Sequence, residues 1–421
     1  MISIPESARS APEPAWPRRA PKRPRRAALS CRDVLDEAER QTRTRGNENH
    51  GFLSWSHGFV PRLPPLRRLA PAFAAWDQAA AELPVLYRDL TLRRRLDELP
   101  LLDAGPESLA DAQVLRACAL LAILAQAYWN VEVTPPERLP LAIAKPWAQL
   151  RQRLGREQEV LSYIDLIVYN WRVVDRALPD PMQVGNLRLL LPTVDNQEER
   201  VFYLTQLEML ARCSPLVQLV THAQDAVLVE DKDALEEALL GVIACLRRIV
   251  CDSLPKINPN AYGSTFVDPV VWAKTVAPFA VPIHAGDQGP SGTSSPIFST
   301  LDLFFGRKRN DSFLGREIQQ LRAGYPPSWR AFLQALSTVR VSDYVERTNN
   351  RSLSGAWREA FELYVGPDGF LGRHRMKVYG FLELAFKVGR SVTIGGFGGV
   401  FKDRTWDQVD NELELSRRER L

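Results

Sequence analysis

The segment from Phe370 to Leu382 contains the residue with the clearest chemical potential, His374. With helical spacing, Phe370, His374, Val378 and Phe381 share one face, so an imidazole lies in the middle of an apolar stripe. The basic residues beside that stripe are Arg373, Arg375 and Lys377. An imidazole that faces a dry interior suits an axial ligand of haem iron, and neighbouring cations suit the haem propionates. A hydrogen-bonded core histidine is the alternative interpretation of the same pattern.

Two segments rich in small residues lie on either side of this helix in the sequence. Residues 289–295 read GPSGTSS, and small residues permit tight turns and close approach of the backbone. A plain surface loop is the alternative for this segment. Five glycines fall between Gly389 and Gly399, and this density predicts a mobile loop.

The composition is that of an ordinary globular protein. The chain has 421 residues, 45% hydrophobic and 25% charged, which is enough for two or three domains. The net charge of +4 comes from the N-terminus, because residues 1–26 hold seven Lys or Arg and two Glu. The rest of the chain is close to neutral, so nothing predicts a nucleic acid as its partner.

Cysteine usage and hydropathy indicate the compartment. The five cysteines are scattered without a CxxC pair, which predicts buried thiols in a reducing compartment rather than disulfides or a zinc site. The longest apolar run, Leu115 to Trp129, is interrupted by polar residues and is too short for a membrane span. No apolar signal-peptide core follows the start. We therefore expect a soluble cytoplasmic protein with no membrane partner.

Helical periodicity dominates the chain and alternating strand patterns are scarce, so the predicted fold class is all-α. Residues 1–45 are predicted to be a disordered, basic and proline-rich tail, within which residues 28–45 are compatible with a short charged helix. Residues 46–192 are predicted to form a small helical domain that includes a helix over 159–176. Residues 193–421 are predicted to form a large helical domain that contains His374.

Five pieces of the sequence occur in the order of a known family. The first is SYID at 162–165 with the Asn-Trp pair at 170–171, and the second is Phe-Tyr-Leu at 202–204. The GPSGTSS segment, the Tyr-Pro-Pro segment at 325–327 and His374 complete the series. Over about residues 51–399, the sequence resembles the indoleamine 2,3-dioxygenase family of haem proteins.

The resemblance implies two helical domains with haem b between them, bound mainly by the large domain, and His374 as the proximal ligand of the iron. In that family ferrous haem binds O2, and both oxygen atoms enter the C2–C3 bond of an indole. Tryptophan thereby becomes N-formylkynurenine, a step of tryptophan catabolism. The partners implied are O2, an indole-type substrate and an electron donor that keeps the iron ferrous.

The resemblance also predicts which side chains line the substrate and distal pocket. They are Tyr163, Phe202, Gln206, Asp268, Ser291, Gly292 and Thr393. The two aromatic rings would pack on the indole, residues 291–292 would border the haem edge, and Gln206 would lie within reach of bound O2. Thr393 would donate to a substrate carboxylate once the glycine loop closes. The propionates would pair with Arg373 and Arg375. Ordinary core aromatics and a turn serine are the alternative interpretations.

One position departs from the family's pattern. Members that act on tryptophan place an arginine shortly after the segment that corresponds to 258–262, where its guanidinium binds the substrate carboxylate. This sequence has Val267 or Asp268 there, and an aspartate repels a carboxylate and favours an amine. The departure therefore favours a tryptophan derivative, a decarboxylated indole or another arylamine as the substrate, beside tryptophan itself. Indole monooxygenation or ring rearrangement on the same fold, and a non-enzymatic O2-binding or haem-sensing protein, are the alternatives.

Overall fold

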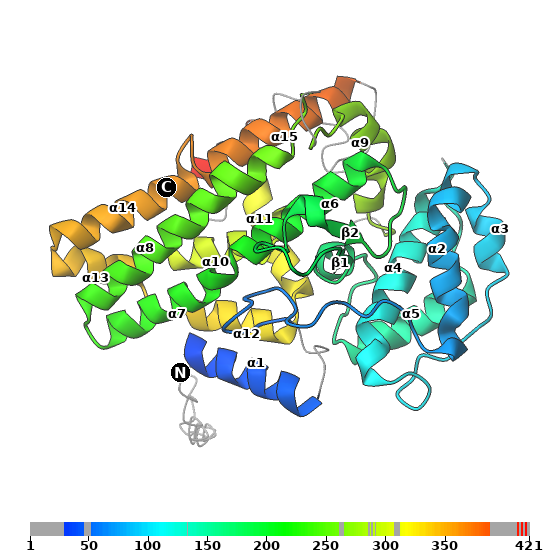
Figure 1. Ribbon diagram of the computed structural model, residues 1–421, viewed down its shortest axis with the longest axis horizontal. Coiled ribbons are helices and arrows are strands. Elements are labelled where there is room, and N and C mark those ends of the chain that lie inside the picture. Colours follow the sequence, from blue (N-terminus) through cyan, green and yellow to red (C-terminus); the bar gives the residue numbers. More distant parts are fainter. Residues whose placement is uncertain are drawn as a thin grey trace, which may run out of the picture.

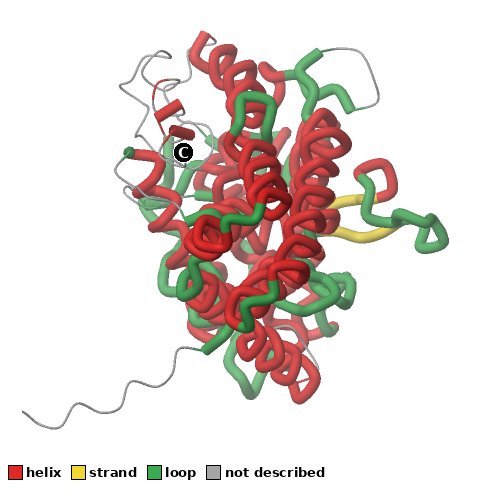
Figure 2. The backbone as a smooth tube through the Cα atoms, turned by 90° about the vertical axis from the view of Figure 1, so that its left-hand side faces the viewer, coloured by secondary structure: helices red, strands yellow, loops and turns green. Residues whose placement is uncertain are grey.

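The computed structural model describes residues 29–45, 52–132, 134–260, 265–284, 287, 289–290, 292–306 and 312–387, together with residues 411, 414, 415, 417 and 418. Helices make up most of these ranges, which confirms the predicted all-α class. The only strands in the described part are β1 (Trp171–Val173) and β2 (Leu187–Leu189), an antiparallel pair that stands out from the helical body in Figure 2.

One group of helices, at the right of Figure 1, is built around a long apolar helix. Its members are α2 (Ala74–Arg88), α3 (Leu92–Asp97), α4 (Val114–Asn130) and α5 (Leu141–Arg153). Helix α4 packs against the other three. By length and composition, the stretch Asp111–Asn130 is apolar enough to cross a membrane, but 83% of its most apolar window is buried inside the protein. Helix α4 is therefore the core helix of this group, because other helices of the group pack against it on several sides.

The remaining helices occupy the centre and left of Figure 1. They are α6 (Gln197–Arg212), α7 (Ser214–Leu228), α8 (Lys232–Arg248), α9 (Pro269–Thr275), α10 (Pro296–Phe304), α11 (Phe313–Leu321), α12 (Pro327–Leu336), α13 (Val341–Thr348), α14 (Arg351–Val365) and α15 (Phe370–Lys387). Helix α8 packs against both α7 and α14, and α15 packs against α9 and α14. The predicted boundary at residue 192 falls in the connection between β2 and α6; the division into two domains stays a prediction.

The first described helix, α1 (Cys31–Arg45), confirms the short charged helix expected over residues 28–45, so the predicted disordered tail does not extend to residue 45. Figure 1 shows α1 beside α12, and it contacts both α12 and α7. The side chains of Cys31, Val34, Leu35 and Ala38 are buried there. Their spacing of three and four residues places them on one face, so this helix has an apolar stripe to bury despite its many charges. Residues 1–28 lie outside the described residues.

The segment that carries Tyr163 also differs from the prediction. Instead of a helix over 159–176, residues Ile164–Val168 form a single π-helical turn that leads into β1. The change of structure is stabilised at Asn170, whose side chain accepts from the backbone N–H of Leu191 at 2.7 Å and donates to its carbonyl at 3.2 Å. This buried amide holds the chain in the turn before the strand pair, a contact that helical periodicity does not reveal.

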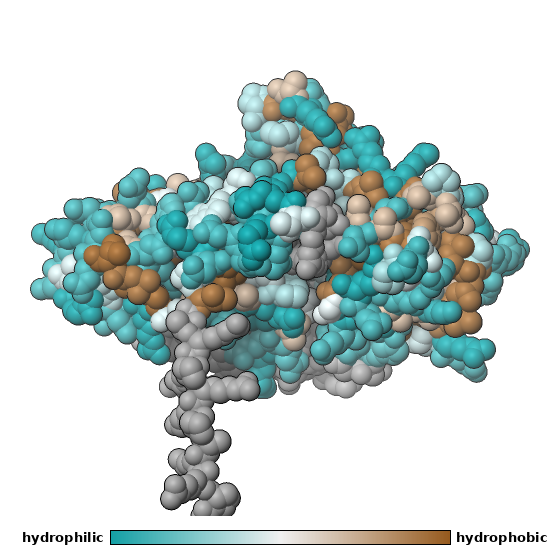
Figure 3. Space-filling model, turned by 90° about the horizontal axis from the view of Figure 1, so that it is seen from below, coloured by the Kyte–Doolittle hydropathy of each residue, from teal (hydrophilic) through white to brown (hydrophobic). Residues whose placement is uncertain are grey.

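Figure 3 shows hydrophilic residues over most of the face seen from below, with apolar side chains in separate patches. Individual exposed apolar residues such as Leu228 and Val229 are ordinary on a protein surface and indicate no particular partner.

Candidate active site

The imidazole of His374 lies in an aromatic environment at the start of α15. Its ring meets the Phe298 ring of α10 edge-on, with the centroids 5.5 Å apart. Phe298 in turn stacks on Phe370 at 4.8 Å, and both phenylalanines are almost completely buried. The predicted apolar stripe therefore exists at Phe370 and Phe381, and the aromatic contacts fix the plane in which the imidazole lies.

The Nε2 atom of His374 faces the GPSGTSS segment. A Cβ atom added to Gly292 would stand 3.6 Å from Nε2, and among the described residues other than its two chain neighbours no further atom lies within 4 Å of that Cβ. Residue 292 therefore places no side chain of its own in front of the imidazole nitrogen. The neighbouring Ser291 lies outside the described residues, as does Thr393.

Two tyrosines hold the other side of this segment. The side chain of Tyr163 lies near Ser295, and the hydroxyl of Tyr325 donates to the Ser294 carbonyl at 3.0 Å. Burial raises the pKa of Tyr163 and raises that of Tyr325 to about 12, so both phenols stay protonated at physiological pH. Tyr163 therefore lies beside the short segment that contains Gly292 and faces His374, although Tyr163 and Gly292 are far apart in sequence.

Phe202 and Gln206 lie one turn apart on the same face of α6. The Phe202 ring contacts Trp272 of α9 at 5.0 Å, and Trp272 contacts Phe381 of α15 at 5.3 Å. Because Phe381 shares a helical face with His374, this row of rings joins α6 to the face of α15 that carries the imidazole. The sequence did not single out Trp272, which lies in a short helix with a weak periodic signal.

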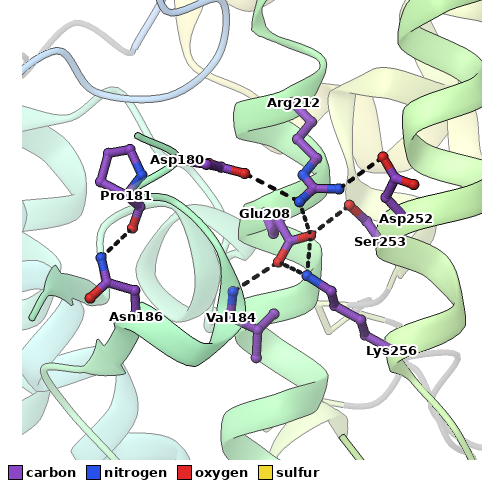
Figure 4. Close-up of polar contacts among 9 residues, drawn as sticks. All are labelled: Asp180, Pro181, Val184, Asn186, Glu208, Arg212, Asp252, Ser253 and Lys256. Atoms are coloured by element: carbon purple, nitrogen blue, oxygen red, sulfur yellow. Dashed lines mark hydrogen bonds and ion pairs between the residues drawn. The ribbon is translucent and has the colours of Figure 1, made fainter. Parts of the chain in front are cut away.

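A buried carboxylate anchors the same helix, as Figure 4 shows. Glu208 is completely buried, and its oxygens lie 2.7 and 2.6 Å from the Lys256 ammonium and 3.2 Å from the Arg212 guanidinium. The same carboxylate accepts from the Ser253 hydroxyl at 2.9 Å and from the Val184 backbone N–H at 2.8 Å. This network ties α6, the helix that also carries Phe202 and Gln206, to the turn before β2 and to the two turns that follow α8. No local pattern in the sequence predicts this network, because its members come from separate segments.

The two arginines that were predicted to pair with the haem propionates already have partners within the protein. Arg373 is exposed and donates to the Asp368 carbonyl at 3.0 Å, whereas Arg375 lies 2.6 Å from Glu414 near the C-terminus. Glu414 also binds Arg417, which donates to the carbonyl of Val365, the last residue of α14. The C-terminal residues thus clamp the start of α15, and the propionate role of both arginines stays a prediction.

This clamp predicts a response to pH. Hydrogen bonds from Arg417 and Arg418 lower the pKa of Glu414 from its ordinary value of 4.5 to about 2. Because the folded pKa is depressed, the contribution of Glu414 is complete above pH 4.5 and is lost as the pH falls towards 2. We expect hydrogen-exchange protection of residues 411–418, measured relative to α8, to persist at pH 4.5 and to fall below it. In Glu414→Gln, low protection already at pH 7 is expected; full protection there would contradict the clamp.

Asp268 occupies a structural position at the start of α9. Its side chain accepts from the backbone N–H groups of Val270 and Val271 at 2.8 and 3.0 Å, which is an N-cap. The following proline is the first residue of the helix, so the Asp-Pro pair carries a sequence signal for this role. Val267, the other residue that could occupy the position of the family's arginine, is fully buried.

Comparison with known proteins places the chain in a family. The family model described as indoleamine 2,3-dioxygenase matches residues 50–279, which is more than half of the chain. The chain belongs to the indoleamine 2,3-dioxygenase family. It is accordingly an oxidoreductase, and its function is that of an indole 2,3-dioxygenase.

Individual relatives agree with this family over a longer part of the chain. The 6-hydroxytryptophan 2,3-dioxygenase fscD of Fusarium equiseti is 27% identical over 319 residues, which cover 70% of this chain and 76% of the relative. Indoleamine 2,3-dioxygenase 1 of Rattus norvegicus is 26% identical over 319 residues, 70% of this chain and 75% of the relative. Indoleamine 2,3-dioxygenase of Saccharomyces cerevisiae is 25% identical over 343 residues, 74% of this chain and 75% of the relative.

This chain lacks the arginine that members of the indoleamine 2,3-dioxygenase family acting on tryptophan are expected to have, and the structure shows which residues stand near that position. The place expected for a carboxylate-binding arginine holds a buried valine and a helix-capping aspartate. An aspartate that accepts two backbone hydrogen bonds has less capacity left to bind a substrate, because capping the helix uses part of its carboxylate. A role of Asp268 in binding a substrate amine therefore stays a prediction that competes with capping.

Proposed function

We propose that this protein inserts both atoms of O2 into the C2–C3 bond of tryptophan or a tryptophan-derived indole, with haem b held by His374. The observation that supports this most directly is the position of His374. Its Nε2 faces a glycine, its ring is oriented by buried phenylalanines, and its helix is joined by aromatic contacts to the wall that carries Phe202.

The residues present fit a haem group. Haem iron takes four nitrogens from the porphyrin and needs only one or two protein ligands, so a single histidine suffices. The described residues contain no cluster of three His, Cys, Asp or Glu side chains, so the donor set suits haem better than a metal bound by several side chains. The buried aromatic rings offer the apolar surface that a porphyrin requires. When bound, the haem would supply O2 binding and activation.

The side chains of the protein would then bind and orient the substrate. Tyr163 and Phe202 would pack against the indole ring and exclude water, and the raised pKa of Tyr163 keeps its hydroxyl neutral. Gly292 would border the haem edge, and Gln206 would stand on the distal side. Thr393 is proposed to donate to the polar end of the substrate, with Asp268 as the alternative partner of an amine. The electron donor and a cytoplasmic location are also part of the proposal.

A substrate panel tests the proposed reaction. The ferrous, haem-loaded protein is incubated with O2 and either L-tryptophan or tryptamine, and the products are identified by mass. A gain of two oxygen atoms is expected, whereas a gain of one would replace dioxygenation by monooxygenation. Turnover of tryptamine but not of tryptophan would show that the site accepts the amine of the substrate and excludes its carboxylate. A stable oxygen complex with no product from any indole would overturn the enzymatic proposal.

A second prediction concerns the glycine in front of the imidazole. Gly292→Val is expected to lower haem retention at least about tenfold, because two added methyl groups enter the space before Nε2. The matched control is Gly355→Val on α14, where an added Cβ meets nothing within 4 Å. Soret absorbance after gel filtration of haem-reconstituted protein measures the difference. Equal haem retention by the two variants would place the haem elsewhere.

A further inference from the structure

Three buried glycines lie at the joint between α14 and α15, the helix that carries His374. They are Gly366, Gly369 and Gly372, which recur every three residues. Figure 1 shows the two helices following one another along the upper side of the molecule. Only residues 366–369 separate them, and the two helices pack against each other. The first turn of α15 therefore begins directly at the end of α14.

The glycines allow the backbone of α15 to touch the carbonyl groups at the end of α14 and in the turn. A Cβ atom added to Gly369 would stand 2.5 Å from the Glu362 carbonyl oxygen and 2.7 Å from that of Leu363. A Cβ atom added to Gly372 would overlap the Pro367 carbonyl oxygen. Real Cβ atoms essentially never come within 3.0 Å of another heavy atom, and a backbone oxygen cannot turn aside as a flexible side chain can. Only glycine lets the two backbones approach so closely.

Hydrogen bonds hold this joint in place. The backbone N–H of Gly369 donates to the Gly366 carbonyl at 3.0 Å, and the side chain of Arg373 donates to the Asp368 carbonyl at 3.0 Å. The backbone N–H of Gly366 donates to the Glu362 carbonyl at 2.8 Å, which joins the turn to the last turn of α14. The turn is thus bonded to both helices, so an added side chain would have to displace α15 itself.

Such a displacement would reach the imidazole. His374 follows Gly372 by two residues, about 3 Å along the axis of the same helix. A Cβ atom on residue 372 would also stand 2.5 Å from the Gly366 carbonyl oxygen, below the 3.0 Å limit, so the first turn would have to move by at least about 0.5 Å. Because the two residues belong to consecutive positions of one helical turn, the imidazole would move with it, relative to Gly292 in front of Nε2.

We propose that Gly372 is a positioning residue for the haem ligand, because its close contact with the turn after α14 sets how far the His374 imidazole reaches towards the iron. The proposal rests on the proposed function, since it takes His374 as the ligand. Functional groups must be held within about 0.5 Å of their productive geometry, which is the size of the displacement that a side chain at 372 would cause. Gly372 therefore acts on the iron through His374 and without touching the haem.

The first test compares two glycine-to-alanine substitutions within helices. Gly372→Ala is expected to lower haem retention at least about tenfold and to change the wavelength of the Soret band. The matched control is Gly355→Ala, because Gly355 is exposed on α14 and an added Cβ there meets nothing within 4 Å. Soret spectra and absorbance per protein are recorded after haem reconstitution and gel filtration. Equal retention and identical spectra in the two variants would overturn the inference.

Thermal unfolding of the full-length, haem-loaded protein checks the contact itself. Alanine stabilises a helix relative to glycine, so Gly355→Ala is expected to raise Tm by about 1–2 °C. Gly372→Ala is expected to lower Tm by about 2 °C or more, because the overlap forces the helix to move. A rise of Tm in both variants would show that the joint accommodates a side chain, and this would contradict the inference.

A double-mutant cycle asks whether Gly372 acts through His374. In His374→Gly the ligand is imidazole added to the solution, which is not attached to α15. We expect Gly372→Ala to change the imidazole-restored Soret absorbance of His374→Gly by less than about twofold, although it lowers that of the wild type about tenfold. Equal losses in both backgrounds would mean that the glycine maintains the fold in general, and the positioning role would be wrong.

The same spectra separate this inference from the function proposed above. A normal Soret band in His374→Ala would contradict haem binding by His374, whatever the effect of Gly372→Ala. Loss of the band in His374→Ala together with a normal band in Gly372→Ala would keep the proposed function and contradict only the role of Gly372.

Discussion

His374→Ala is expected to lose its haem on purification, with a fall in haem affinity of at least about 100-fold, or about 2.7 kcal/mol. The imidazole is the single protein ligand proposed for the iron, and no other histidine is described in contact with Phe298 or Gly292. The measurement is the Soret absorbance per protein after reconstitution with excess haem and gel filtration. Turnover of any indole should disappear together with the Soret band.

The control separates a ligand from a structural histidine. His222→Ala removes an exposed imidazole that packs against the Trp55 ring, and the Soret band should be unchanged. In His374→Gly, added imidazole is expected to enter the vacated space and to restore part of the band. Retention of a normal spectrum in His374→Ala would make this residue a core histidine. Failure of rescue with a folded protein would point to an effect on packing.

Glu208→Ala is expected to lower the free energy of unfolding by about 3–5 kcal/mol. The substitution leaves the Lys256 ammonium and the Arg212 guanidinium without their buried partner. It also leaves the backbone N–H of Val184 and the Ser253 hydroxyl without an acceptor. Removing one member of a buried ionic network costs more than the net value of its contacts, because the remaining charges stay desolvated. Urea unfolding followed by circular dichroism measures the change.

The same network contains its own matched control. Asp252 also pairs with Arg212, at 3.3 Å, but 55% of its side chain is exposed. Exposed ion pairs contribute little, so Asp252→Ala is expected to cost less than about 1 kcal/mol. If both variants lost the same stability, burial would not be the reason for the effect of Glu208. Glu208→Gln, which keeps the shape of the side chain, should fall between them.

Several features of this protein could be predicted from neighbouring residues alone. The apolar stripe around His374 follows from spacing at three and four residues, a property that any helix imposes on its sequence. The same rule identifies the packed face of α1, although the charges of that segment obscured it. The Asp-Pro pair at 268–269 is a local signal for the start of α9, and with it the capping role of Asp268 was within reach of the sequence.

Other features depend on residues that are far apart in the chain. Phe202, Trp272 and Phe381 form one row of rings, yet each sits in a separate helix. No local pattern predicts which aromatic residues of different helices will meet, because their contact depends on how the helices pack. The π-helical turn after Tyr163 has the same origin, since Asn170 is held by Leu191 on the neighbouring strand connection.

From the residues alone we could predict the helical class, the apolar setting of His374 and, through five short segments in order, the family. These are properties of local spacing and residue type, which survive without knowledge of the fold. Only the tertiary structure placed Gly292 before the imidazole, gave Glu208 its four partners and left Gln206 with an unpaired acceptor. The physical reason is that burial and hydrogen bonding are decided by the elements packed around a side chain, and those come from distant parts of the chain.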